Sequence, residues 1–104
     1  MENDILFDMN DEVPSLFEWD PEKDRKNQEK HKLPLTAAVN FDFSTANIFQ
    51  DARRDYGERR YNAYGFDTEG HAMCLCFTFR ECIRFISYRP MNSRERKKFL
   101  TELE

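Results

Sequence analysis

The chain has 104 residues, of which 39% are hydrophobic and 35% charged, and its formal net charge is −4. A chain of this length forms one domain with a single small core, and its apolar content argues against a wholly disordered protein. No apolar run approaches the roughly 20 residues of a membrane helix, and the acidic start is unlike a signal peptide, so we expect a cytoplasmic protein.

Charge is unevenly distributed along the chain. Residues 1–16 hold five acidic residues and no basic one, whereas residues 53–98 hold eleven Lys or Arg and six Asp or Glu. We expect residues 1–16 to be a flexible acidic extension and residues 17–104 to be the folded domain. A basic surface can bind nucleic acid, and one hypothesis is that the acidic extension folds over it and inhibits binding.

Two helices are predicted at the start of the domain. Asp20 followed by Pro21 is typical of an N-cap and a first helical position, which predicts a helix over residues 21–31. A second, shorter helix is predicted over residues 36–41, with Leu35 among its inward-facing neighbours.

Four strands and a terminal helix follow. Alternating apolar residues and turn signals predict strands over residues 44–51, 58–66, 71–79 and 83–89. A charged helix is predicted over residues 93–102, with Ser93 as its cap. The fold class is therefore α+β, with two N-terminal helices, a four-stranded antiparallel sheet and a C-terminal helix.

Candidate site residues follow from the alternation of side chains along the strands. Glu58 and Arg60 share a face of the second strand, and Ser87 and Arg89 share a face of the fourth, with Arg84 opposite. In an antiparallel meander, Glu58, Arg60 and Arg89 would converge at one edge of the sheet.

Such a set of residues suits RNA cleavage without a metal or another cofactor. The ribose 2′-OH attacks the adjacent phosphate, a carboxylate or histidine takes its proton, and arginine forks bind the phosphate oxygens. Tyrosines such as Tyr61, Tyr64 and Tyr88 could stack on unpaired bases. No glycine-rich phosphate loop, metal triad or serine nucleophile motif occurs, which leaves nucleotide hydrolysis and acyl transfer unsupported.

The same residues also have purely structural interpretations. Exposed arginines commonly form ion pairs that contribute little, and Glu58 and Arg60 can form a cross-strand ion pair. His31 at a helix end interacts favourably with the helix dipole. The three cysteines, Cys74, Cys76 and Cys82, are predicted to be reduced and structural, because their spacing suits a metal site poorly.

Four short patterns occur in a fixed order along residues 17–99. They are Phe17-x-Trp19-Asp20-x-x-Lys23-x-x-x-Asn27-x-x-Lys30-His31, Phe41-Asp42-Phe43-x-x-Ala46, Asp51-x-Arg53-x-Asp55-Tyr56-Gly57-Glu58-x-Arg60 and Arg84-Phe85-Ile86-Ser87-x-Arg89-x-x-Asn92-x-Arg94-Glu95. Together they make the chain resemble the BrnT family of bacterial type II toxins. The chain departs from the family pattern at residues 88–91, Tyr-Arg-Pro-Met, and in the acidic residues 1–16, which are not part of the pattern.

The resemblance implies a RelE-like fold, a ribonuclease that inhibits translation, and a BrnA-like antitoxin of the ribbon-helix-helix type that also binds operator DNA. By position, it implies that the charged candidates of the family fall on Lys30, His31, Glu58, Arg60, Arg80, Arg84 and Arg89. Among these we expect Glu58 or His31 to take the 2′-OH proton, Arg60 and Arg89 to bind the phosphate, and Lys30, Arg80 and Arg84 to bind the RNA. The alternative is a non-catalytic binding module that docks such an antitoxin and assists operator repression.

Overall fold

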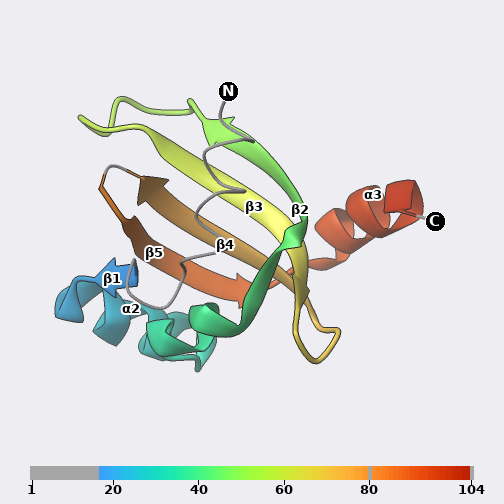
Figure 1. Ribbon diagram of the computed structural model, residues 1–104, viewed down its shortest axis with the longest axis horizontal. Coiled ribbons are helices and arrows are strands. Elements are labelled where there is room, and N and C mark those ends of the chain that lie inside the picture. The colour runs from blue at the N-terminus through green and yellow to red at the C-terminus, as the bar shows by residue number, and fades with distance from the viewer. Residues whose placement is uncertain (1–16, 80, 104) are drawn as a thin grey trace.

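The computed structural model describes residues 17–79 and 81–103. Its elements are β1 (Phe17–Trp19), α2 (Pro21–His31), the 3-10 helix η2 (Leu35–Asn40), β2 (Phe41–Asp51), β3 (Arg60–Asp67), β4 (Ala72–Phe79), β5 (Ile83–Pro90) and α3 (Ser93–Leu103) (Figure 1). The acidic extension, residues 1–16, and the RNA-binding candidate Arg80 lie outside the described residues. No helix within the described ranges is long and apolar enough to cross a lipid bilayer.

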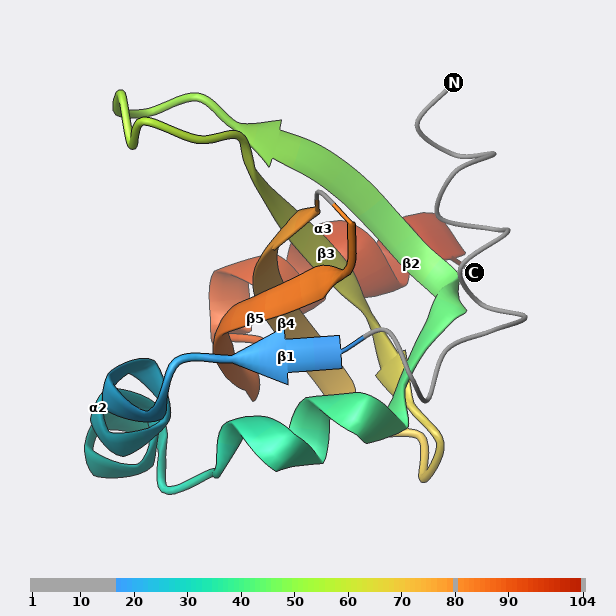
Figure 2. The same ribbon diagram turned by 60° about the vertical axis from the view of Figure 1, so that its left-hand side comes forward.

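One five-stranded mixed sheet organises the fold, in the order β1-β5-β4-β3-β2. Strands β2 to β5 form the predicted antiparallel meander. The prediction of four strands is wrong, because β1 adds a fifth strand that runs parallel to β5, with Phe17 opposite Ile83 (Figure 2). A strand of three residues is too short to show alternation, and its partner lies far away in the sequence.

Both predicted N-terminal helices are found near their predicted positions, but the second is of another type than predicted. Helix α2 begins where predicted, with the Glu22 amide donating to the Asp20 carboxylate at 2.9 Å. The second predicted helix is a 3-10 helix, and β2 begins at Phe41 rather than at residue 44. Phe41 and Phe43 are both buried on one face of the sheet, so the strand extends to cover the core. The α+β class holds, while the arrangement of two helices before the sheet does not, because β1 precedes them.

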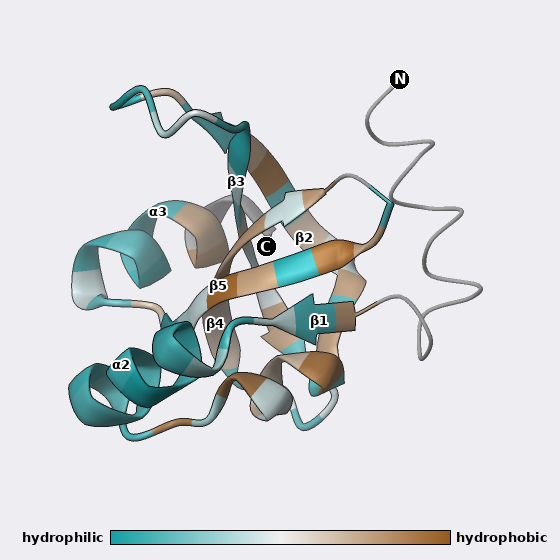
Figure 3. Ribbon diagram, turned by 90° about the vertical axis from the view of Figure 1, so that its left-hand side faces the viewer, coloured by the Kyte–Doolittle hydropathy of each residue, from teal (hydrophilic) through white to brown (hydrophobic). Residues whose placement is uncertain are grey.

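One face of the sheet carries the main core. Leu35 and Ala38 of η2 pack there against strand residues that include Leu75, Phe77 and Phe85. Helix α2 has almost no apolar side chain, as its hydrophilic colour in Figure 3 shows. It cannot be held mainly by hydrophobic burial, so polar contacts must attach it to the sheet.

Asn27 is the residue that attaches α2 to β5. Its amide nitrogen donates to the carbonyl oxygens of Leu33 and Tyr88 at 2.8 and 2.9 Å, and its amide oxygen accepts from the Tyr88 amide at 2.9 Å. Asn27 is buried, so each bond satisfies a group that water cannot reach. The side of α2 that carries Lys30 and His31 is thereby fixed relative to the sheet.

A β-bulge in β5 changes the predicted faces of that strand. Ser87 pairs with Cys76 and Phe85 with Phe77, so Ile86 is an extra residue that reverses the alternation. The prediction that Arg84 lies opposite Arg89 is therefore wrong. Ile83, Phe85 and Tyr88 face the core, while Arg84, Ser87 and Arg89 share the other face.

Candidate functional site

A polar groove of about 470 Å³ lies on the face of the sheet opposite the core. Helix α2, the start of the β2–β3 connection, strands β3 to β5 and the first turn of α3 all contribute to it. Its charged lining residues are six bases and two carboxylates, namely Lys23, Lys26, Lys30, Arg53, Arg60, Arg89, Asp51 and Glu95. With His31 neutral, these groups sum to a formal charge of +4, so the groove is suited to a polyanion.

His31 is the titratable side chain in the groove that can exchange a proton near neutral pH. It ends α2 and is partly buried. Burial lowers the pKa of His31 below its ordinary value of 6.5, and the positive charges of Arg89 and Lys30 lower it further. The imidazole is therefore mostly uncharged at physiological pH and has a free lone pair that can accept a proton.

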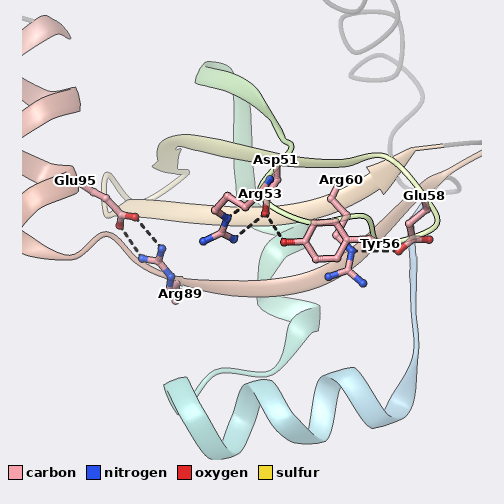
Figure 4. Close-up of polar contacts among 7 residues, drawn as sticks. All are labelled: Asp51, Arg53, Tyr56, Glu58, Arg60, Arg89 and Glu95. Atoms are coloured by element: carbon pink, nitrogen blue, oxygen red, sulfur yellow. Dashed lines mark hydrogen bonds and ion pairs between the residues drawn. The ribbon is translucent and has the colours of Figure 1, made fainter.

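Asp51, Arg53 and Tyr56 form a hydrogen-bonded cluster at the end of β2. Arg53 donates from Nε and Nη2 to the two carboxylate oxygens of Asp51 at 2.9 and 2.8 Å, and the Tyr56 hydroxyl lies 3.2 Å from the same carboxylate (Figure 4). The hydrogen bonds from Arg53 hold the pKa of Asp51 far below its usual range. Asp51 therefore remains ionised and orients the other two side chains instead of exchanging protons.

Arg60 lies between the groove and a neighbouring cavity. Its guanidinium carbon is 4.1 Å from the centre of the Tyr56 ring, and its Nε is 3.2 Å from a carboxylate oxygen of Glu58. Glu58 precedes β3 and lines the neighbouring cavity of about 540 Å³, together with Arg84. The Nη1 atom of Arg84 is 2.7 Å from the Oε2 atom of Glu18 in β1. Glu58 thus contacts a residue of the groove, but does not line it.

Arg89 lies at the other end of the groove, in a two-point contact with Glu95 of α3. Its Nη1 and Nη2 donate to the two carboxylate oxygens at 2.7 and 2.8 Å (Figure 4). The same carboxylate accepts from the Asn92 amide at 3.0 Å, and the Glu95 amide donates to the Asn92 side chain at 2.8 Å. Asn92, not the predicted Ser93, therefore caps α3 in a reciprocal capping box.

The floor of the groove is made of side chains that stay protonated. Burial raises the pKa of Cys74 and of Cys76 to about 11, and that of Tyr64 to about 12. All three cysteines are free, as predicted. A thiol with so high a pKa is a poor nucleophile, so Cys74 and Cys76 are not suited to attack a substrate in the groove. Of the tyrosines considered for base stacking, Tyr64 lines the groove, whereas Tyr88 is buried in the core.

The structure brings together four of the predicted site residues, namely Lys30, His31, Arg60 and Arg89. Glu58 and Arg84 lie in the adjacent cavity instead. The prediction missed Asp51, Arg53, Tyr56 and Glu95. The signal was present, because all four occur in the patterns that carry the family resemblance, but nothing in the sequence shows that Asp51 binds Arg53 and Tyr56, or that Glu95 binds Arg89.

A group of potential metal ligands lies outside the groove. Asp67, Glu69 and His71 on the β3–β4 turn have potential ligand atoms within 4.8 Å of one another. The His71 Nδ1 and the Asp67 carboxylate already bond each other at 2.9 Å. None of the three lines the groove, so they have no evident part in its chemistry.

Comparison with known proteins identifies the family. Residues 19–95 match the family model described as the ribonuclease toxin BrnT of type II toxin–antitoxin systems. Among solved structures, the chain is similar to the crystal structure of the ribonuclease toxin BrnT of Brucella abortus, with 26% identity, a TM-score of 0.57, and coverage of 72% of this chain and 94% of that one. No curated protein sequence matches the chain significantly. The match to the family model spans more than half of the sequence, so the chain belongs to the BrnT family of ribonuclease toxins of type II toxin–antitoxin systems.

Proposed function

We propose that this chain is a metal-independent endoribonuclease that cleaves RNA in the polar groove and thereby inhibits translation. The observation that carries the proposal is a partly buried His31, with a lowered pKa, facing a groove whose charged side chains are mostly arginine and lysine. An uncharged imidazole supplies a proton acceptor, and the cations supply stabilisation for a phosphate whose charge increases in the transition state.

In the proposed reaction, His31 accepts the proton of a ribose 2′-OH. The 2′ oxygen forms a bond to the adjacent phosphorus, and the bond from phosphorus to the 5′ oxygen breaks, which leaves a 2′,3′-cyclic phosphate. The leaving oxygen takes a proton from water, because the groove is open to solvent. Arg60 and Arg89 donate hydrogen bonds to the phosphate oxygens, for which the planar guanidinium is well shaped.

The proposed substrate is a single strand. Lys23, Lys26 and Lys30 form a basic row along the α2 side of the groove, suited to a phosphate backbone. Phe49 of β2 pairs with Asn62 beside the groove and is 49% exposed, and its ring centre is 6.2 Å from that of Tyr64, which lines the groove. A base that has left its stack can pack on this ring, whereas a paired base in a duplex cannot.

Membership of the family implies an antitoxin partner. We propose that this partner is a BrnA-like protein of the ribbon-helix-helix type, that it covers the basic groove, and that DNA is contacted only through it. The proposed place of action is the cytoplasm. A groove with a surplus of four positive charges favours a partner that presents acidic side chains.

RNA cleavage by the purified chain in the presence of EDTA tests the proposal. We expect the wild type to release fragments with 5′-OH ends, and His31→Ala to reduce the cleavage rate by at least about a hundredfold, which is typical of the loss of a general base. His71→Ala is the matched control, because His71 lies outside the groove, and it should cleave like the wild type. A folded wild type that binds RNA without cutting it would favour the non-catalytic binding module.

A further inference from the structure

Glu95 is a carboxylate inside a groove that otherwise attracts anions. It binds Arg89, which the proposed mechanism uses to hold phosphate, through both terminal nitrogens. We propose that Glu95 is a positioning residue, which fixes the guanidinium of Arg89 so that one defined edge of it remains available to the RNA phosphate. This inference rests on the proposed function and extends it by one residue.

The hydrogen-bond pattern of Arg89 carries the argument. A guanidinium has five N–H hydrogens in a fixed plane. Glu95 takes one from Nη1 and one from Nη2, and the Pro90 carbonyl oxygen, 3.2 Å from Nη1, takes a third. Among the described residues nothing else accepts from this guanidinium, so two hydrogens remain, the one on Nε and the second one on Nη2. They lie on the same edge of the plane and point in parallel directions, which suits two oxygens of one phosphate.

Arg53 shows the opposite arrangement. Asp51 takes the Nε and Nη2 hydrogens of Arg53, so the edge that Arg89 keeps free is occupied in Arg53. The Arg53 side chain is also 78% exposed, whereas that of Arg89 is 27% exposed and that of Glu95 is 16% exposed. Both arginines are held by a carboxylate, but within residues 17–79 and 81–103 the edge formed by Nε and Nη2 has an acceptor in Arg53 and none in Arg89.

The pair also sets the charge of this end of the groove. Hydrogen bonds from Arg89 lower the pKa of Glu95, so the carboxylate is ionised at neutral pH and the pair has no net charge. Loss of Glu95 would leave a more positive but less ordered site. Loss of Glu95 should therefore leave RNA binding unchanged or stronger, because binding depends on charge, and should slow RNA cleavage, because cleavage depends on the orientation of Arg89.

Glu95 has a second role as part of the capping box of α3, and this role must be separated from the first. Asn92 shares the cap with Glu95, and its side chain accepts from the Glu95 amide, whereas the acceptors of Arg89 are Glu95 and the Pro90 carbonyl. Asn92→Ala removes half of the cap and leaves the contact between Glu95 and Arg89, so it is the matched control. Urea unfolding of each variant establishes that it is folded under the assay conditions.

Steady-state RNA cleavage tests the role. We expect Glu95→Gln to lower kcat by about 10- to 100-fold, as expected for a misplaced catalytic group, while KM is unchanged or lower. Asn92→Ala should keep kcat within about twofold of the wild type, in line with a change that leaves the active geometry intact. In an Arg89→Ala background, Glu95→Gln should have no further effect, because the group that it orients is gone.

Three outcomes would overturn the inference. If the wild type cleaves RNA and the kcat of Glu95→Gln is unchanged or raised, Glu95 does not orient Arg89 and only competes with the RNA phosphate for it. Equal losses in Glu95→Gln and Asn92→Ala would show that it only caps α3. A wild type without RNA cleavage would overturn the proposed function together with this role. If Glu95→Gln does not fold, Glu95→Asp replaces it, since the shorter side chain keeps the charge but cannot maintain both contacts to Arg89.

Discussion

The two faces of the sheet differ in what holds their side chains in place. On the core face, Phe77, Phe85 and Tyr88 are fully buried and fixed by packing. On the groove face, Arg53 and Arg89 are fixed by carboxylates, each through two hydrogen bonds. Strand β5 supplies Phe85 and Tyr88 to the core face and Arg89 to the groove face, so stability and the proposed catalysis depend on different residues of one strand and can be changed separately.

The bulge at Ile86 connects the two faces. Without this extra residue, the alternation that buries Ile83 and Phe85 would also turn Arg89 toward the core. With it, Tyr88 enters the core and Arg89 enters the groove. Bulges often lie next to functional sites, where they redirect one side chain without changing the strand order.

Replacement of a buried aromatic ring by alanine should give the largest loss of unfolding free energy among the variants proposed. Phe85 is 0% exposed and its ring centre is 4.8 Å from that of Phe17. We expect Phe85→Ala to lower the free energy of unfolding by about 3–5 kcal/mol, because it removes apolar contacts and leaves a cavity. Urea unfolding measures this cost.

Phe49→Ala is the matched control on the groove face. Because Phe49 is half-exposed, the substitution should cost less than half as much stability as Phe85→Ala. It should raise the KM for RNA by at least about fivefold, as the loss of one stacked base predicts. If Phe49→Ala were the more destabilising of the two, the assignment of the faces would be wrong.

Asn27→Ala should have an intermediate effect that reaches both faces. It leaves the buried amide and carbonyl of Tyr88 without their side-chain partner, which we expect to cost about 2 kcal/mol of unfolding free energy. It should also lower the cleavage rate, because α2 carries His31. Gln28→Ala, at the exposed neighbouring position, should change neither quantity. A silent Asn27→Ala would show that α2 is held by other contacts.

The pH dependence of cleavage gives the smallest expected effect. The pKa of His31 is lowered from its ordinary value of 6.5, so the imidazole loses its proton at a lower pH than in a free histidine. A general base acts when deprotonated, so kcat/KM should rise with pH along an acid limb whose midpoint lies below 6.5. Removal of the nearby charge in Arg89→Ala should move this midpoint upward. An acid limb centred above pH 7 would contradict the assignment of His31 as the base.

Much of the fold was predictable because its signals are local. The Asp20-Pro21 start of α2 and the alternation in β3 depend on neighbouring residues, and both predictions are confirmed. The strand β1 and the bulge at Ile86 were not predictable, because each depends on pairing with a distant segment. One extra residue in β5 was enough to place Arg84 on the wrong face.

The basic residues that line the groove were easier to identify from the sequence than its carboxylates. Charge and resemblance identified His31, Arg60 and Arg89, all of which line it. Asp51 and Glu95 were missed because their importance lies in which arginine each one binds, and this follows only from the folded chain. Glu58 was selected because it lies two residues before Arg60 and would share its face in a continuous strand. Strand β3 begins only at Arg60, however, and Glu58 lies beside the groove.

The most direct test of the account uses an RNA whose cleavage site has been mapped. A second substrate is then made with a single 2′-deoxy nucleotide on the 5′ side of the cleaved bond, and both are incubated with the wild-type chain in EDTA. We predict that the all-ribose strand is cut and ends in a 2′,3′-cyclic phosphate, and that the substituted strand is not cut at that bond. Equal cleavage of the two strands would contradict attack by the 2′-OH and the role proposed for His31.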